Sequence, residues 1–135
     1  VHKTQDALID RLITIRTGHY GRAAEIAITV ARSGVPEADA GTIVDVVREL
    51  RGIGVNNHRP TIRACIAIGR ILARMQAGAR WDDAMFRVVC HDVLNTDTAK
   101  VTRGGESLMP QKVDEVIQKV CAPQSKRATQ RVGAA

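Results

Sequence analysis

Two arginines occupy positions from which a positive side chain could take part in chemistry. Arg11 lies in the segment ALIDRL, residues 7–12, where a helix is expected to give way to a strand. Arg63 lies in NHRPTIRA, residues 57–64, in the expected first turn of a helix. Because a helix N-terminus presents free N–H groups and a positive partial charge, an arginine there can complete an anion site. The residues alone also allow the ordinary interpretation, a surface arginine or, for Arg11, a partner of Asp10.

Other kinds of self-contained active site find no support in the sequence. Gly104-Gly105 is followed by Glu106 and lacks the lysine and the helix start that a phosphate-binding loop requires. The histidines and cysteines show no paired ligand spacing, which argues against a zinc site. The cysteines are odd in number, far apart and set among apolar residues, which predicts buried thiols. They are Cys65, Cys90 and Cys121.

Length and composition indicate one domain with a real core. The chain has 135 residues, of which 44% are hydrophobic, so collapse is expected. No apolar run approaches the roughly 18 residues of a spanning helix, and the polar start does not resemble a signal peptide. We therefore expect a soluble, cytoplasmic protein without membrane partners. Since the first residue is Val1, we also expect a piece of a longer protein.

The charge balance favours an acidic partner. The formal net charge is +6, and nucleic acid is the usual partner of so basic a chain. Aromatic residues make up only 2% of the chain, however, which leaves little for base stacking. Part of the excess charge also lies in the tail after residue 122. Charge alone does not decide the function.

Apolar spacing and breakers predict a mainly α fold of about five helices. The helices are expected near 22–33, 36–51, 60–77, 83–94 and 110–121. A short helix at 4–10 and a strand at 12–15 are expected before them, and residues 95–109 are expected to form an exposed loop. The tail, residues 122–135, is basic and rich in small residues, so disorder is predicted there.

The helical periodicity also predicts which faces are buried. On the helix at 22–33, a solvent-exposed stripe is predicted at Arg22, Glu25, Thr29 and Arg32. The helix at 60–77 is expected to bury Ala64, Ile68, Ile71 and Met75, with arginines on another face at Arg63, Arg70 and Arg74. The predicted core comprises Ile26, Val30, Ile43, Val47, Leu50, Ile68, Ile71, Phe86, Val89, Val93, Val116 and Val120.

Several stretches resemble a known family. VHKTQDALIDRLITI resembles the end of the AAA+ core in MoxR-type ATPases, with Leu12 where these have phenylalanine. TIRA, residues 61–64, resembles the helix start that carries their sensor-2 arginine. The longer stretches resemble gas-vesicle ATPases of the GvpN type, in the CbbQ/NirQ/NorQ/GvpN branch, over roughly residues 1–121. These stretches are GVNNHRPTIRACIAIGRIL, FRVVCHDVLNTDTAKVTR and LMPQKVDEVIQKVC.

The resemblance implies a place for each part of the chain. Residues 1–18 would end the AAA+ α/β core, 19–121 would form the helical lid, and 122–135 would be the tail. Arg11 would be an arginine finger acting in trans on the neighbouring subunit, and Arg63 would be sensor 2, contacting the ATP γ-phosphate. Walker A, Walker B and sensor 1 would precede Val1. This segment alone is therefore expected to bind no cofactor and to be inactive.

For the full-length protein, the resemblance implies an ATPase that uses ATP and Mg²⁺. It would form a homo-oligomeric ring, expected to be hexameric, with gas vesicle proteins as clients whose assembly it assists. It would be cytoplasmic and associated with gas vesicles. Three alternatives stay open: a CbbQ-like or NorQ-like activator of a metabolic enzyme, a basic helical nucleic-acid-binding module, and a plain interaction scaffold.

Overall fold

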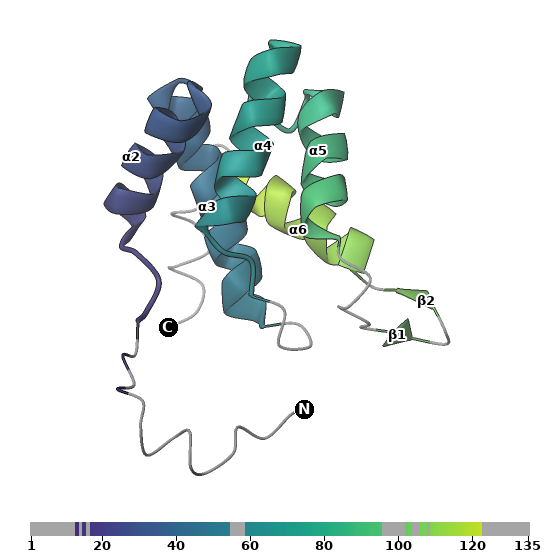
Figure 1. Cartoon of the computed structure of the whole chain (residues 1–135). Helices are drawn as coiled ribbons and strands as arrows, with labels where there is room; N and C mark the ends of the chain where they lie inside the picture. The colour runs from purple at the N-terminus through teal and green to yellow at the C-terminus, as the bar shows by residue number, and fades with distance from the viewer. Residues whose placement is uncertain are drawn as a thin grey trace, which may run out of the picture.

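A computed structural model describes residues 13, 15, 17–54, 59–95, 102–103, 106–107 and 109–122. The described residues form five α-helices and one short antiparallel hairpin (Figure 1). The helices are α2 (Arg22–Ser33), α3 (Glu37–Ile53), α4 (Ile62–Met75), α5 (Ala84–Leu94) and α6 (Met109–Cys121). The strands are β1 (Thr102–Arg103) and β2 (Glu106–Ser107). The predicted mainly α class is confirmed.

Local signals account for the helix boundaries. Gly34 ends α2 in the left-handed conformation, with φ of 78°, which a residue without a Cβ adopts at no steric cost. The α4 and α5 helices begin after Thr61 and Asp83, whose side chains accept hydrogen bonds from backbone N–H groups of the first turn. The α4 helix therefore starts two residues later than the predicted Pro60, because Thr61 takes the capping position.

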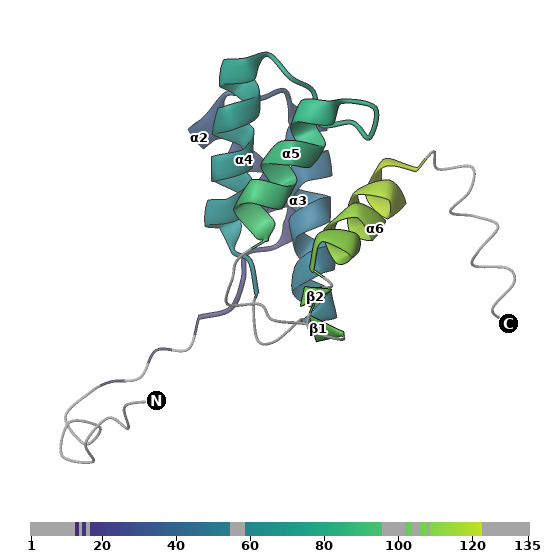
Figure 2. The same ribbon diagram turned by 90° about the vertical axis from the view of Figure 1, so that its right-hand side faces the viewer.

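The helices pack in a continuous series around a shared core. Helices α2, α3 and α4 contact one another, α5 packs on α4, and α6 packs on α3 and α5. Figure 2 shows α6 crossing beside α3 and α5, away from α2. The largest fully buried apolar side chains come from every helix except α2. They are Phe86, Ile43, Leu50, Ile68, Leu72, Leu94, Met109, Ile117, Val44, Val46 and Val47.

Most of the predicted core is confirmed, with one face misplaced. Ile26, Val30, Val93 and Val120 are only partly buried but pack against the core. Ile71 and Met75 were expected inside and are 39% and 54% exposed. The α4 face that is buried instead runs through Cys65, Ile68, Gly69 and Leu72, between α2, α3 and α5.

The predicted polar stripe of α2 is exposed only at its two ends, where Arg22 and Arg32 are exposed as predicted. Glu25 and Thr29 were predicted to be exposed, and both are 0% exposed. The Thr29 hydroxyl donates to the carbonyl of Glu25 at 2.7 Å, and the Glu25 carboxylate binds two arginines of α3. Because both polar groups have partners, their burial is tolerated.

Parts of the sequence-based prediction fall outside the described residues. These parts are the helix at 4–10, Arg11 and the tail from residue 123. Of the strand expected at 12–15, the structure describes Ile13 and Ile15, which lie outside regular structure and are 92% and 80% exposed. A strand needs a neighbour to pair with, and these residues lie beside none in the described chain.

The region expected to be a loop, 95–109, contains a hairpin. Thr102 pairs with Ser107 and Arg103 with Glu106 in antiparallel register. The last helix begins at Met109, one residue before the predicted Pro110, and Met109 is buried. Across the described helices, none is long and apolar enough to cross a membrane.

Candidate functional site

The start of α4 is built to present positive charge. Thr61 is extended, and its Oγ1 accepts from the N–H of Arg63 at 3.3 Å, while its carbonyl accepts from the N–H of Ala64 at 2.9 Å. The first turn of α4 contains no acidic residue. The partial positive charge of the helix N-terminus is therefore not neutralised within its own helix.

Two arginines lie beside this N-terminus. Arg59 and Arg63 are exposed, and in the described part of the chain neither guanidinium forms a hydrogen bond or an ion pair. Both line a hollow of about 340 Å³ together with Thr61, Ala64 and Val93, among others. A guanidinium offers five N–H donors in a planar fork that matches a phosphate. The arrangement suits an anion.

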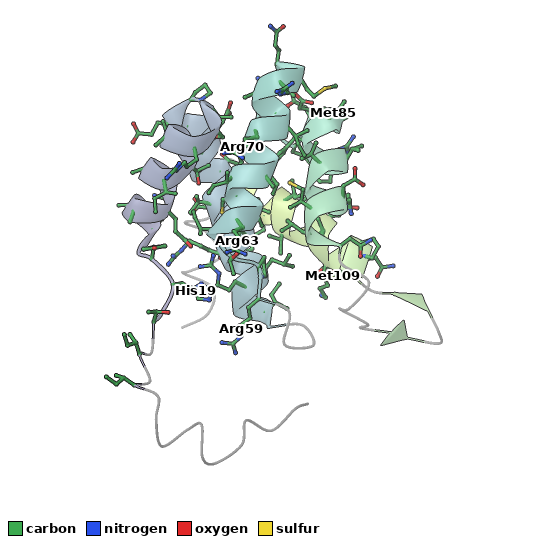
Figure 3. All side chains as sticks on the ribbon, viewed as in Figure 1. His19, Arg59, Arg63, Arg70, Met85 and Met109 are labelled. Carbon is green, nitrogen blue, oxygen red and sulfur yellow. The ribbon has the colours of Figure 1, made fainter. Side chains whose placement is uncertain are left out.

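A second hollow opens on the other side of Thr61. It has a similar volume, about 340 Å³, and is lined by the segment 17–20, Glu25, Thr61 and Ile62. Figure 3 shows His19, Arg59 and Arg63 at the same end of the helical body, where α4 begins. The segment that leads into α2 and the N-terminus of α4 thus border one region.

A buried ion cluster lies directly behind this region. The Glu25 side chain is 1% exposed, and its two oxygens accept from Arg51 Nη2 at 2.9 Å and Arg48 Nη1 at 3.0 Å. Arg51 Nε also donates to the carbonyl of Pro60 at 2.8 Å, next to the cap of α4. This cluster was not predicted from the sequence. A lone glutamate among the Ala, Ile and Val of α2, with two arginines three residues apart on α3, was the available signal.

Among the other arginines predicted on this face, Arg70 is held by a hydrogen bond. Arg63, Arg70 and Arg74 are exposed, as predicted. Arg70 Nε donates to the carbonyl of Arg32 at 3.0 Å, so it caps the C-terminus of α2. Of the two arginines given chemical roles, the structure places Arg63 in the first turn of α4, whereas Arg11 lies outside the described residues.

The two buried thiols, those of Cys65 and Cys90, are not part of a reactive site. Burial, followed by the negative charge of Glu25, raises the pKa of the Cys65 thiol to about 12. Burial raises the pKa of the Cys90 thiol as well. Since the thiolate is the nucleophile and the metal ligand, these cysteines are inert at neutral pH. Among the described residues, no group of three or more His, Cys, Asp or Glu could hold a metal ion.

Comparison with known proteins identifies one relative. The chain is 42% identical over 96 residues to the gas vesicle ATPase GvpN of Ancylobacter aquaticus. This alignment covers 71% of the chain but 27% of the relative, so the chain spans about a quarter of that protein's length. No family model and no solved structure matches. The resemblance to gas-vesicle ATPases is confirmed, and it agrees with a chain that corresponds to the C-terminal part of such a protein.

Proposed function

We propose that this chain, as a relative of the gas vesicle ATPase GvpN, is the C-terminal lid segment of an AAA+ ATPase that assists gas vesicle assembly. The observation that carries the proposal is the 42% identity over 96 residues. The helical body and the position of the exposed Arg63 in the first turn of α4 support it. In this proposal, residues 19–121 form the lid and residues 1–18 end the α/β core.

Arg63 contacts the γ-phosphate of ATP bound to its own subunit. Hydrolysis develops negative charge on the transferred phosphoryl group, which a positioned guanidinium stabilises. The N-terminus of α4 adds its partial positive charge at the same place. Arg59 is also exposed and unpaired beside Arg63 in the described chain, and it reinforces the field. Movement of α4 would then depend on whether the γ-phosphate is present.

Arg11 acts in trans as the arginine finger of the neighbouring subunit's site. This role rests on its place in the motif ALIDRL, residues 7–12. It requires a homo-oligomeric ring, for which we propose a hexamer. Arg11 and Arg63 would then approach two different nucleotides, one across the subunit interface and one within the subunit.

The full-length protein supplies the remaining parts of the site. In this proposal, Mg²⁺ would be held with the Walker motifs, which would precede Val1. The segment alone is expected to be inactive as an ATPase. We propose a cytoplasmic protein associated with gas vesicles, with gas vesicle proteins as its clients.

The proposal is tested on the full-length protein and in its cells. Purified protein should hydrolyse ATP only with Mg²⁺, and deletion of its gene should reduce the number of vesicles counted by electron microscopy. Normal vesicles together with the loss of a metabolic enzyme's activity would instead support the CbbQ-like or NorQ-like alternative. Absence of Mg²⁺-dependent hydrolysis would contradict the ATPase assignment.

A nucleic-acid-binding module is the second candidate. The exposed arginines of α4, Arg63, Arg70 and Arg74, favour it. Phosphate contacts of this kind weaken steeply as salt rises. A gel shift of DNA or RNA by the 135-residue chain that disappears between 50 and about 200 mM salt would therefore support it. No shift at low salt would exclude it.

A further inference from the structure

The Glu25 carboxylate holds two arginines in fixed positions. One of its oxygens binds Arg51 and the other binds Arg48, at 2.9 and 3.0 Å. The Glu25 side chain is 1% exposed and the Arg51 side chain 10%. The Arg48 side chain, at 38%, is more exposed. A buried charge without a partner is strongly unfavourable, so Glu25 and Arg51 require each other.

Each arginine continues to a backbone carbonyl outside α2 and α3. Arg51 Nε donates to Pro60 at 2.8 Å, and Arg48 Nη1 donates to Tyr20 at 3.3 Å. Pro60 directly precedes Thr61, the cap of α4. Because the donors of a guanidinium lie in one rigid plane, the orientation that Glu25 imposes on Arg51 also determines where the Pro60 carbonyl lies.

We propose that Glu25 is a positioning residue for Arg63, acting through Arg51 and the Pro60 carbonyl. The role rests on the proposed function insofar as Arg63 contacts the γ-phosphate. Stability alone does not account for the cluster, because apolar residues of similar volume often stabilise as well as a buried ion pair. The cluster instead joins the segment before α2, through Tyr20, to the first turn of α4. Both borders of the candidate site therefore depend on one carboxylate.

Amide hydrogen exchange in the 135-residue chain tests the positioning without any nucleotide. Glu25→Gln keeps the shape but removes the charge, so the Ala64 N–H, which bonds to Thr61, should exchange about tenfold faster or more. A general loss of stability accelerates exchange in every helix, so the Val47 N–H in α3 serves as the internal reference.

Asp45→Asn is the matched control. Asp45 forms another ion pair between α2 and α3, with Arg22, at 2.6 and 2.8 Å. Its removal should leave Ala64 exchange, relative to Val47, at the rate of the unaltered chain. The proposal would be overturned if the Ala64 exchange rate, relative to that of Val47, were the same in Glu25→Gln as in the unaltered chain. It would also be overturned if Asp45→Asn raised this relative rate as much as Glu25→Gln does.

A second pair of variants covers the case in which Glu25→Gln does not fold. Arg51→Lys keeps a positive charge facing Glu25 but loses the Nε donor to Pro60, so Ala64 exchange should rise. Arg48→Lys loses the Nη1 donor to the Tyr20 carbonyl and should leave the exchange rate of the Ala64 N–H unchanged. The same rate in both variants would refute the route through Pro60.

Kinetics of the full-length ATPase separate this inference from the proposed function. Glu25→Gln should lower kcat with little change in the KM for ATP, because the misplaced Arg63 loses a contact made mainly in the transition state. If Arg63→Ala leaves turnover intact, the proposed function fails whatever the exchange data show. If Ala64 exchange is unchanged in Glu25→Gln, the positioning role fails whatever the turnover shows.

Discussion

Gly69 of α4 lies directly against Ser33 of α2. A Cβ at position 69 would lie 2.6 Å from Ser33 Oγ and 2.8 Å from Ser33 Cβ, closer than side chains approach one another. The Ser33 hydroxyl also donates to the carbonyl of Thr29 at 2.6 Å, so it is not free to turn away. The absence of a side chain at position 69 is therefore what allows α2 and α4 to approach closely.

Gly69→Ala should destabilise the chain. The added methyl group forces α2 and α4 apart or breaks the Ser33 hydrogen bond, and such overpacking costs about 1–3 kcal/mol. Gly41→Ala is the control, because a Cβ there meets its nearest atoms at 3.7 and 3.9 Å, an ordinary contact. It lies within α3 and should stabilise by about 0.5–1 kcal/mol. Urea unfolding followed by circular dichroism measures both, and a stabilised Gly69→Ala would contradict the close approach.

Ile68→Ala and Ile71→Ala should differ sharply although they share a helix. Ile68 is fully buried, so its truncation should cost about 2–5 kcal/mol. Ile71 is 39% exposed, and its truncation should change the unfolding free energy by about 0.5 kcal/mol or less. Equal effects in urea unfolding would mean that α4 is rotated from the orientation described.

The stability of the chain should fall in acid partly through Asp83. This carboxylate accepts hydrogen bonds from Gly78 N–H and Met85 N–H, each at 3.0 Å, and these bonds lower its pKa, with Gly78 the largest cause. The unfolded chain then binds the proton at a higher pH, near the ordinary value of about 3.9. The stabilisation is complete above that value and is lost as pH falls through the lower folded pKa.

In Asp83→Asn, the free energy of unfolding should therefore fall less steeply as the pH is lowered. Urea unfolding midpoints measured between about pH 5 and pH 2 test this, because that range spans the ordinary pKa of aspartate. Asp92→Asn removes an exposed carboxylate from α5, the helix that Asp83 caps, and should leave this pH dependence of stability as steep as in the unaltered chain. An identical pH dependence in Asp83→Asn and the unaltered chain would refute the capping role of this carboxylate.

Arg63→Ala should reduce ATP turnover by the full-length protein by about 10²-fold, the cost of removing one donor from developing charge. Nucleotide-dependent closure of the lid, followed by fluorescence energy transfer, should be lost with it. Arg74→Ala, an exposed arginine at the other end of α4, should leave both unchanged. Full activity of Arg63→Ala would mean that Arg63 is an ordinary surface arginine with no role in hydrolysis.

Arg11→Ala should abolish hydrolysis while leaving ATP binding nearly intact. Arginine fingers contribute about 10³–10⁵ in rate, so a loss below tenfold would remove Arg11 from the site. Because the finger acts in trans, mixing this variant with a Walker-B variant should restore some activity at mixed interfaces. No restoration in mixed rings would indicate that Arg11 acts within its own subunit.

Helix positions could be predicted from local patterns because their causes are local. The bounds of α2 agree with the predicted 22–33, since apolar spacing and Gly34 act within a few residues. The placement of Arg63 in a first turn followed in the same way from Pro60 and Thr61. The hairpin was missed, although Gly104-Gly105 between two short segments is a known signal for a two-residue turn.

The face of α2 that is buried could not be predicted locally. A polar stripe through Glu25 and Thr29 has the same spacing whether it meets water or the core. Glu25 is buried because α3 brings Arg48 and Arg51, 23 and 26 positions away, into hydrogen-bonding distance. Without those partners the carboxylate would have to stay in water. Contacts this distant in sequence arise only when the helices pack. The same packing places Glu25, Arg48 and Arg51 behind the candidate site at the start of α4.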